Sequence, residues 1–421
     1  RDTLVYGLQW GVMMLSSNIF LPLILGGALG FSTEMTAGFL QRTLIVLGIG
    51  SLIQIYLGHR ITMFEAAAAF WISTFLIVGQ EGLGAGEPLE TILSKIQFLY
   101  LSTGVLILLF TATGMAARLR KFFTPLVMGT TLILICLQVS GNMVRGMFLS
   151  GDGVADPRLI AFSSVLFFSV LFISFRGGRL QPLVGLAGLG GGWAVYLILG
   201  LPRGSVVSFP PFVLPELFAF GMPGPYWNLL PLSFFIMMIY LSNEITSMNA
   251  CGEVLQVKIT DSHIRRGAYW GGILHLVALV FSAIAMVPAA MAAGLVATTG
   301  VGARRTLAVG CVFLILLGLI GPVGAFFAAI PPAVSYSVSL AIFSRIIGIG
   351  LKNVHDAGLE ERSLIIASVS LLMGAGIMFL PAGVFSGLGF LSGIFGNGLV
   401  MGMATAIGLE NILFRERKLA A

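Results

Sequence analysis

Residues 96–111 read IQFLYLSTGVLILLFT and contain no charged side chain. A membrane-spanning β-strand would alternate apolar and polar residues over about ten positions, and this run does not alternate. A helix crossing about 30 Å of hydrocarbon needs about 20 mainly apolar residues. The stretch therefore indicates a transmembrane helix and argues against a β-barrel.

The same pattern extends over the whole chain. Of its 421 residues, 57% are hydrophobic and only 10% are Asp, Glu, Lys or Arg, whereas a soluble domain carries about 25% charged residues. We predict an all-α polytopic membrane protein that forms a single membrane domain over residues 1–421. The predicted spans are 4–29, 36–57, 62–79, 95–117, 122–142, 159–175, 182–200, 227–250, 268–287, 288–300, 304–327, 331–349, 363–380 and 390–414.

The basic residues divide unevenly between alternate connectors. If the N-terminus is cytoplasmic, 18 of the 23 Lys and Arg residues fall on the cytoplasmic side. Cytoplasmic loops of membrane proteins are enriched in Lys and Arg. We therefore expect both termini to face the cytoplasm and the protein to lie in the cytoplasmic (inner) membrane. The net charge of +6 then reflects topology and does not indicate a nucleic-acid partner.

Fourteen spans divide into two sets of seven, over residues 1–200 and 227–414. An odd number per set makes the second set enter from the opposite face, so we expect inverted repeats. Short alanine-rich stretches, EAAAAF at 65–70 and PAAMAAG at 288–294, fall at matching places. Paired interrupted segments expose backbone N–H groups to a ligand and mark transporter binding sites. The alternative is that these small residues only allow helices to pack closely.

Glu244 is the acidic residue placed deepest in a predicted span. It follows an apolar run and lies in the sequence SNEITSMN at 242–249. A charge near the bilayer centre costs at least about 2.5 kcal/mol, so its presence suggests a function. A buried carboxyl can hold or release a proton near neutral pH, and it can accept two adjacent hydrogen bonds from a flat heterocycle. The alternative is a neutral Glu that only bonds neighbouring helices.

Other polar or reactive residues have simpler explanations. Glu65 is either in the cavity or paired with Arg60, and His275 is expected to be a structural histidine. We expect Arg42 to reach the membrane interface from near a span end. The cysteines, Cys136, Cys251 and Cys311, are interpreted as small core residues.

Motifs of enzymes and metal sites are missing from the sequence. There is no HExxH, GxSxG or GxxxxGK[ST], and the four histidines do not cluster at metal-ligand spacing. We therefore predict that the protein is not an enzyme, binds no metal and has no cofactor. Transport against a gradient would use an ion, with H⁺ expected and Na⁺ the alternative.

Several stretches match, in chain order, the motifs of one transporter family. They are Gly7-Leu8-Gln9, Leu21-Pro22, Leu57-Gly58-His59-Arg60-Ile61, Asn243-Glu244, Thr299-Gly300-Val301-Gly302-Ala303-Arg304 and Ile330-Pro331-Pro332-Ala333-Val334. With them and its fourteen predicted spans, nearly the whole chain resembles the nucleobase–ascorbate transporter family. This family, also called nucleobase:cation symporter-2, includes uracil and xanthine permeases.

The resemblance implies a secondary active permease for a purine or pyrimidine base, with spans 1–4 and 8–11 as a core and spans 5–7 and 12–14 as a gate. It implies proton symport through Glu244 and a homodimer. It places Phe343 as a gate residue. The implied substrate-binding residues are Ala69, Phe70, Glu244, Met248, Ala290, Met291 and Ala292.

The chain departs from the family pattern at the predicted site. Met291-Ala292 stands where relatives have a polar pair, and Glu65 begins a stretch in which the family's serines are alanines. Met248 stands where relatives often have Asp or His. The alternatives are an anion carrier of the same fold, a passive channel and a non-transporting membrane scaffold.

Overall fold

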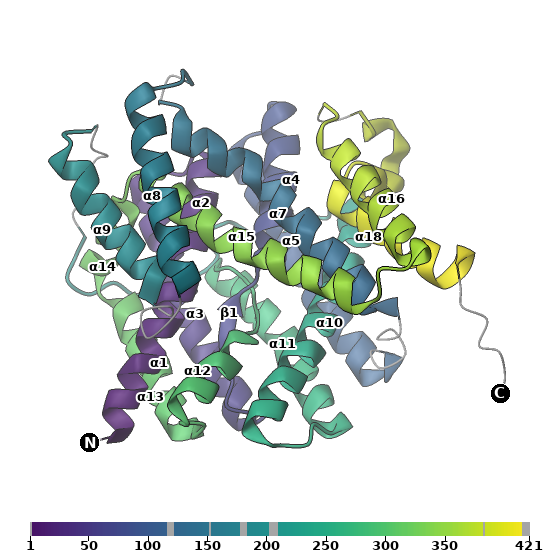
Figure 1. The fold of residues 1–421 in the computed structure, drawn as a ribbon, viewed down its shortest axis with the longest axis horizontal. Coiled ribbons are helices and arrows are strands. Elements are labelled where there is room, and N and C mark those ends of the chain that lie inside the picture. The colour runs from purple at the N-terminus through teal and green to yellow at the C-terminus, as the bar shows by residue number, and fades with distance from the viewer. Residues whose placement is uncertain are drawn as a thin grey trace.

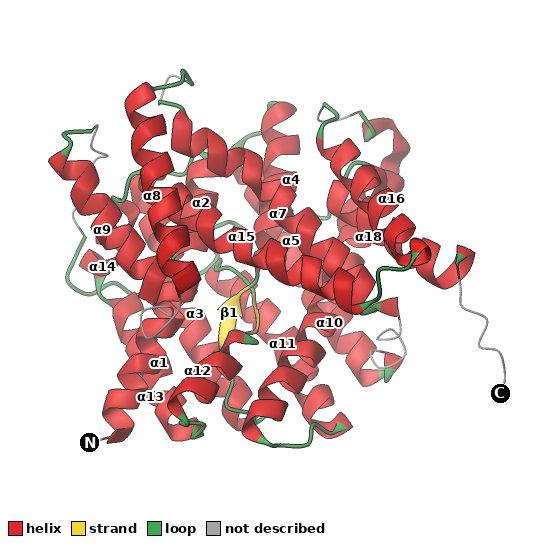
Figure 2. Cartoon of the chain, viewed as in Figure 1, coloured by secondary structure: helices red, strands yellow, loops and turns green. Residues whose placement is uncertain are grey.

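The computed structural model of the chain describes residues 2–115, 122–150, 153–176, 183–201, 209–381 and 384–414. The described chain is mainly helical, and a pair of short strands lies at its centre (Figures 1 and 2). The elements of the first half are α1 (Asp2–Asn18), α2 (Phe20–Leu29), α3 (Thr33–Tyr56), β1 (Glu65–Ala67), α4 (Ala69–Gly84), α5 (Leu89–Ala112), α7 (Pro125–Phe148), α8 (Pro157–Arg176) and α9 (Val184–Ile198).

The second half repeats the succession of long helices and one short strand. Its elements are η3 (Trp227–Leu229), α10 (Leu230–Leu255), α11 (Asp261–Phe281), β2 (Met286–Pro288), α12 (Met291–Thr299), α13 (Arg304–Leu319), α14 (Gly321–Ala328), α15 (Pro332–Asp356), α16 (Glu361–Met378), η4 (Ser386–Leu391), α17 (Ser392–Phe395), α18 (Gly398–Gly408) and η5 (Leu409–Leu413).

Local sequence explains where several helices begin. Ser32 caps α3 by accepting a hydrogen bond from the N–H of Met35 at 3.1 Å. Thr124 caps α7 in the same way, from Val127 N–H at 3.2 Å, and Pro125 follows at the first helical position. These side chains satisfy N–H groups that have no partner inside the helix. Polar connector residues therefore fix the ends of strongly apolar helices.

Eight helical stretches of the described chain are long and apolar enough to cross a membrane. They are Asp2–Leu29, Thr33–Tyr56, Leu89–Ala112, Pro125–Phe148, Pro157–Arg176, Trp227–Leu255, Pro332–Asp356 and Glu361–Met378. Val184–Ile198 and Gly398–Leu413 are apolar but shorter. The protein is therefore a multi-pass helical membrane protein. Fewer spans meet this length test than the fourteen predicted, because several predicted spans are interrupted, as in α4 and α12.

The helices pack in two groups. The first helix group contains α1, α3, α5, α10, α11 and α13, with α13 packed on α1 and α3 and with α5 packed on α10 and α11. The second helix group contains α7, α8, α9, α15, α16 and α18, with α15 packed along α7 and against α8 and α9. Helix α2 contacts α7 and α15, and α4 contacts α7. These contacts join the two groups.

Strands β1 and β2 form a two-stranded antiparallel pair at the centre of the bundle (Figure 2). Glu65 lies opposite Pro288, and Ala67 lies opposite Met286. Backbone polar groups cannot stay unpaired inside a membrane, and here the two interrupted segments satisfy each other. The N–H of Ala68 donates to Ala285 O at 3.1 Å, and that of Ala289 donates to Phe64 O at 3.0 Å.

Side chains from neighbouring helices complete the strand pairing. Helix α1 ends at Asn18, whose Oδ1 accepts the N–H of Ala67 at 2.6 Å. Ser51 on α3 accepts the N–H of Glu65 at 2.9 Å. On the other strand's side, Thr43 accepts the N–H of Ile284 at 3.3 Å. The interrupted segments are thus held by polar residues within apolar helices.

Candidate functional site

Two half-length helices begin directly after the strand pair. Ala68 precedes α4 and Ala290 precedes α12, and neither residue offers a side chain that caps its helix. The first N–H groups of a helix have no partner inside the helix. A helix start also carries a partial positive charge that favours electron-rich ligand groups. Trp71, Ala292 and Ala293 already donate their N–H groups to backbone carbonyls. Donation to a ligand therefore falls to the first N–H groups, those of Ala69, Phe70 and Met291.

The two helix starts differ in exposure. Ala290 and Met291 are exposed, Met291 by 50%, whereas Ala292 is fully buried. At the start of α4, Ala69 is half-buried and Phe70 is 3% exposed. The start of α12 is thus open and the start of α4 is covered in this conformation.

Glu244 lies inside the first helix group. Its side chain is fully buried, and neither carboxylate oxygen has a hydrogen-bond partner among the described residues. A Cβ added at Gly267 on α11 would clash with Glu244 Oε1 and with the Met248 methyl group, and would lie 3.2 Å from His59 Cβ. Glu244 and Met248 therefore come together as predicted neighbours, and they face α11 and the connector that follows α3.

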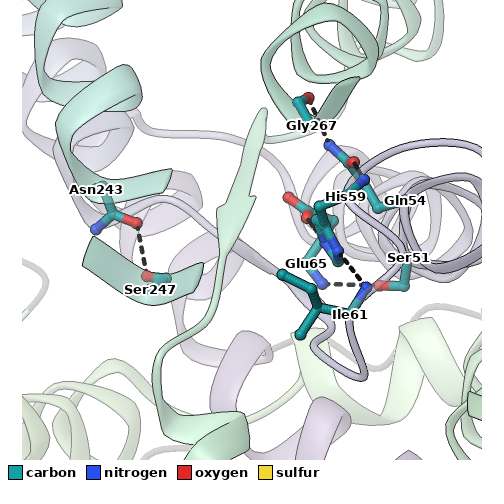
Figure 3. Close-up of polar contacts among 8 residues, drawn as sticks. All are labelled: Ser51, Gln54, His59, Ile61, Glu65, Asn243, Ser247 and Gly267. Carbon is teal, nitrogen blue, oxygen red and sulfur yellow. Dashed lines mark hydrogen bonds and ion pairs between the residues drawn. The ribbon is translucent and has the colours of Figure 1, made fainter. Parts of the chain in front are cut away.

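His59 lies near Gly267 and is also close to Glu65. His59 Nε2 is 3.6 Å from Glu65 Oε1, and both side chains are at most 1% exposed. The N–H of Ile61 donates to His59 Nδ1 at 3.0 Å, so Nε2 carries the hydrogen of the neutral ring. Gln54 links this cluster to α11, because its Nε2 donates to Gly267 O at 3.1 Å (Figure 3). We call Glu65, His59 and Glu244 the buried acid cluster.

The polar residues beside Glu244 on α10 lie apart from the buried acid cluster. Ser247 donates to Asn243 Oδ1 at 3.3 Å, and Figure 3 shows this pair apart from His59 and Glu65. Asn249 is exposed. The predicted polar stripe on α10 is therefore split, with Glu244 directed at the cluster and Asn243 away from it.

A cleft of about 410 Å³ lies where the two helix groups meet, near the ends of α2, α7 and α14. Gly27, Gly146 and Tyr336 are among its lining residues. The Tyr336 hydroxyl donates to Ile24 O at 3.1 Å, which ties α15 to α2. Glu244 does not line this cleft. Its carboxyl is thus packed in the interior and is not open to this cleft.

The remaining predicted residues are placed as follows. Phe343 on α15 is 4% exposed, and its carbonyl accepts the Cys136 thiol at 3.6 Å. His275 is structural, as predicted, because Nδ1 contacts Gly271 O at 2.8 Å and Nε2 accepts the Trp71 indole N–H at 3.4 Å. The three cysteines are buried and free, as predicted.

One prediction about a charged residue is wrong, and one of the two alternatives left open for Glu65 is excluded. Arg42 does not reach the interface: it is 5% exposed, its Nε donates to Ser282 O at 3.4 Å, and its guanidinium lies 5.7 Å from the Phe220 ring centre. A carbonyl and an aromatic face thus replace water around this cation. Arg60 does not pair with Glu65, because its Nε donates to Tyr56 O at 3.1 Å in a left-handed turn at φ 59°.

Sequence reasoning did not single out His59 or Gly267 as part of the site. Their signal is weak, because His59 lies in a connector beside basic residues and Gly267 is one of 55 glycines. His59 lies 185 residues before Glu244, whereas Gly267 lies 23 residues after it, on the next helix. The geometry alone brings the three together.

A multi-pass helical bundle with paired interrupted segments at its centre is the architecture of a membrane transporter. Comparison with known families agrees: the chain belongs to the permease family, whose model matches residues 1–383. It is therefore a permease and not an enzyme.

Among curated relatives, the chain is 29% identical to the putative purine permease YwdJ of Bacillus subtilis, over 98% of this chain and 96% of that protein. It is 27% identical to the uric acid permease PucJ of the same organism, over 97% and 92%. It is 26% identical to the xanthine permease XanQ of Escherichia coli K12, over 86% and 82%.

Solved structures share the fold. The transmembrane domain of the cyanobacterial bicarbonate transporter BicA matches with a TM-score of 0.66 and 16% identity, over 90% of this chain and 96% of that chain. The murine anion transporter Slc26a9, in its inward-facing state, matches with a TM-score of 0.69 and 10% identity, over 97% and 68%. At these identities the likeness concerns the fold.

Proposed function

We propose that the protein carries a purine or pyrimidine base across the cytoplasmic membrane by proton-coupled alternating access. The observation that carries this proposal is the pair of uncapped helix starts beside the buried acid cluster. Backbone N–H groups can bind the carbonyl oxygens of a planar base, and a carboxyl can bind its N–H groups. The names of the relatives support a purine as the first base to test.

The order of the elements supports fourteen spans arranged as inverted repeats. In each half, two helical segments precede a strand and a half-length helix, as in β1–α4 and β2–α12. The strands pair antiparallel, which fits segments that enter from opposite faces. We propose the first helix group, with α2, α4, α12 and both strands, as the core and the second as the gate. Both termini then face the cytoplasm.

We assign the substrate site to Ala69 and Phe70 at the start of α4 and to Ala290, Met291 and Ala292 at the start of α12. Phe70 can stack on a planar base, and the apolar α12 start leaves recognition there to backbone N–H groups. Glu244 is occluded in this conformation, so we propose that it meets the base after the core moves, with Met248 beside it. Phe343 on α15 serves as a gate residue, and the protein acts as a homodimer.

Counterflow in proteoliposomes tests the function. Vesicles loaded with unlabelled xanthine or uric acid should accumulate the labelled base transiently, because a carrier exchanges substrate. A passive channel would give no such stimulation, and a scaffold would give no flux. Stimulation by sulfate or bicarbonate, with none by either base, would favour an anion carrier instead.

Glu244→Gln tests the proposed coupling residue. We expect it to abolish uptake against a concentration gradient, because the amide cannot release a proton at neutral pH. Glu253→Gln is the matched control, since Glu253 is exposed on the same helix. Full uptake with unchanged pH dependence in Glu244→Gln would refute the assignment. Mass measurement in lipid nanodiscs tests the dimer.

A further inference from the structure

Glu65 carries a second buried carboxyl, to which the function proposed above gives no role of its own. It is 1% exposed, and neither of its side-chain oxygens has a hydrogen-bond partner among the described residues. Its backbone is fixed, since its N–H donates to Ser51 Oγ and it lies opposite Pro288 in the strand pair. The side chain is therefore held in the interior by the backbone and not by bonds of its own.

Glu65 and Glu244 are electrostatic neighbours although they lie on different elements. His59 lies close to both carboxyls. Its Nε2 is 3.6 Å from Glu65 Oε1. A Cβ added at Gly267 would lie 3.2 Å from His59 Cβ and would also clash with Glu244 Oε1, so His59 and Glu244 both border Gly267. Three titratable groups thus lie close together in the buried interior.

The groups around the acid cluster provide no cation that would stabilise two negative charges. His59 is neutral, because its Nδ1 accepts the Ile61 N–H, and the carboxyls have no Lys or Arg ion pair among the described residues. Tyr240 lies one turn before Glu244 on α10, and His263 lies one turn before Gly267 on α11, where its Nδ1 bonds the Thr260 hydroxyl. Neither offers a fixed positive charge.

Two adjacent carboxylates cannot both be ionised at low cost in such a volume. Burying one uncompensated charge is already expensive, and a like charge beside it adds repulsion. The pair therefore retains at least one proton, as paired carboxyls do in acid sites. Removing the second proton requires a counter-charge or an opening of the volume, which a conformational change can supply.

The cluster also lies next to the protein surface. Arg60 is exposed directly after His59, and Leu57 is 48% exposed two residues before it. The connector that holds His59 is thus exposed on one side and buried on the other.

We infer that Glu65 is a second proton-binding residue of this permease and shares a proton with Glu244 across His59. A proton that leaves a carboxyl oxygen of one residue binds a carboxyl oxygen of the other, and this transfer leaves the number of protons on the pair unchanged. The pair changes from one to two bound protons when it takes a second proton from water on one side of the membrane, and returns to one when it releases that proton to water on the other side. This inference rests on the proposed function and extends it from one coupling residue to two.

The test compares Glu65→Gln, Glu65→Asp and the control Glu253→Gln in proteoliposomes with an imposed pH gradient and labelled xanthine or uric acid. We expect Glu65→Gln to keep counterflow exchange but to lose gradient-driven accumulation by at least about 10-fold. Glu65→Asp should restore part of the accumulation with a shifted pH profile. Accumulation and pH profile equal to wild type in Glu65→Gln would overturn the inference.

An infrared pH titration of the detergent-purified protein separates this inference from the proposed function. Glu65→Gln should remove part of the absorption of protonated carboxyl groups that wild type shows, whether or not either base is carried. An unchanged signal would overturn the inference by itself. If wild type exchanges neither base, the proposed function fails and the infrared result still decides on Glu65. If Glu65→Gln does not fold, the pH profile and signal of Glu65→Asp decide, with values equal to wild type counting against the inference.

Discussion

The two interrupted segments share a position in the fold but differ in chemistry. The first, β1 with α4, begins with Glu65 and places Phe70 and Trp71 in the buried interior. The second, β2 with α12, has no charged residue and exposes Ala290, Met291 and Gly294. One segment therefore contributes a titratable group and aromatic surface, and the other contributes an open, apolar surface with backbone donors.

This difference suggests that the two interrupted segments have different functions in transport. The closed side can hold a proton because water is excluded there, and the open side can admit a ligand because it is exposed. A symmetric pair of polar segments would leave both sides hydrated or both closed. The predictions below test this asymmetry, from the largest expected effect to the smallest.

Among these variants, we expect Gly267→Ala to reduce transport most, because it disturbs the buried region around Glu244. The added methyl group would clash with Glu244 Oε1 and the Met248 methyl group, and displacing a reacting group by about 1 Å can cost about 100-fold in rate. We expect uptake of labelled xanthine to fall by about that factor. Gly190→Ala is the control, because a Cβ there meets nothing within 4 Å. Equal uptake by both variants would contradict the packing described around Glu244.

We expect Asn18→Ala, which affects strand β1, to lower the thermal stability of the protein more than Thr43→Ala, which affects the residues before strand β2. Asn18 accepts the N–H of Ala67 at 2.6 Å, whereas Thr43 accepts that of Ile284 at 3.3 Å. Leaving a buried N–H unpaired costs about 1–3 kcal/mol, and we expect the shorter bond to lie at the upper end. Thermal unfolding in detergent measures both. A larger loss for Thr43→Ala would reverse the comparison.

Met291→Cys should react with a membrane-impermeant thiol reagent at least about 10-fold faster than Ala292→Cys, because thiol reactivity follows exposure. Met291 is 50% exposed and its neighbour Ala292 is fully buried. The native cysteines are buried, which lowers the background. Inside-out vesicles give access from the proposed cytoplasmic side. Equal rates for the two positions would contradict an open α12 start.

Met291→Gln should have the smallest effect, a change of about 2–10-fold in the affinity for xanthine. One added hydrogen bond is worth about 0.5–1.5 kcal/mol, and an exposed position accepts a polar side chain without loss of stability. Competition by unlabelled xanthine against labelled uptake measures it, with Met291→Leu as the apolar control. Identical affinity in both variants would exclude contact between position 291 and the base.

Much of the fold follows from sequence because burial in lipid imposes long apolar runs. The stretch at 96–111 lies within α5, and predicted spans beginning near residues 122, 159 and 331 correspond to α7, α8 and α15. Pairing of the two alanine-rich stretches could not be predicted, because alanine has weak strand preference and the partners are more than 200 residues apart. The break after Asn18 fits Pro22, which lies four residues later and lacks the N–H that would bond Asn18 O.

The candidate site was predictable in part. A carboxyl in an apolar span singled out Glu244, and the repeat argument singled out the starts of α4 and α12. The burial of Arg42 could not be predicted, because Ser282 O and the Phe220 ring that compensate it come from distant segments. The approach of His59 to Glu65 depends on a left-handed turn at Arg60, a residue type that rarely adopts it.

The register of the strand pair limits how this chain can vary in length. Inserting or deleting one residue between Phe64 and Ala68 would turn Glu65 to the opposite face of the strand. Relatives that align without gaps through both strands can thus keep the same residues inward. Gaps in an alignment at β1 or β2 would therefore mark proteins whose interior carries a different set of side chains.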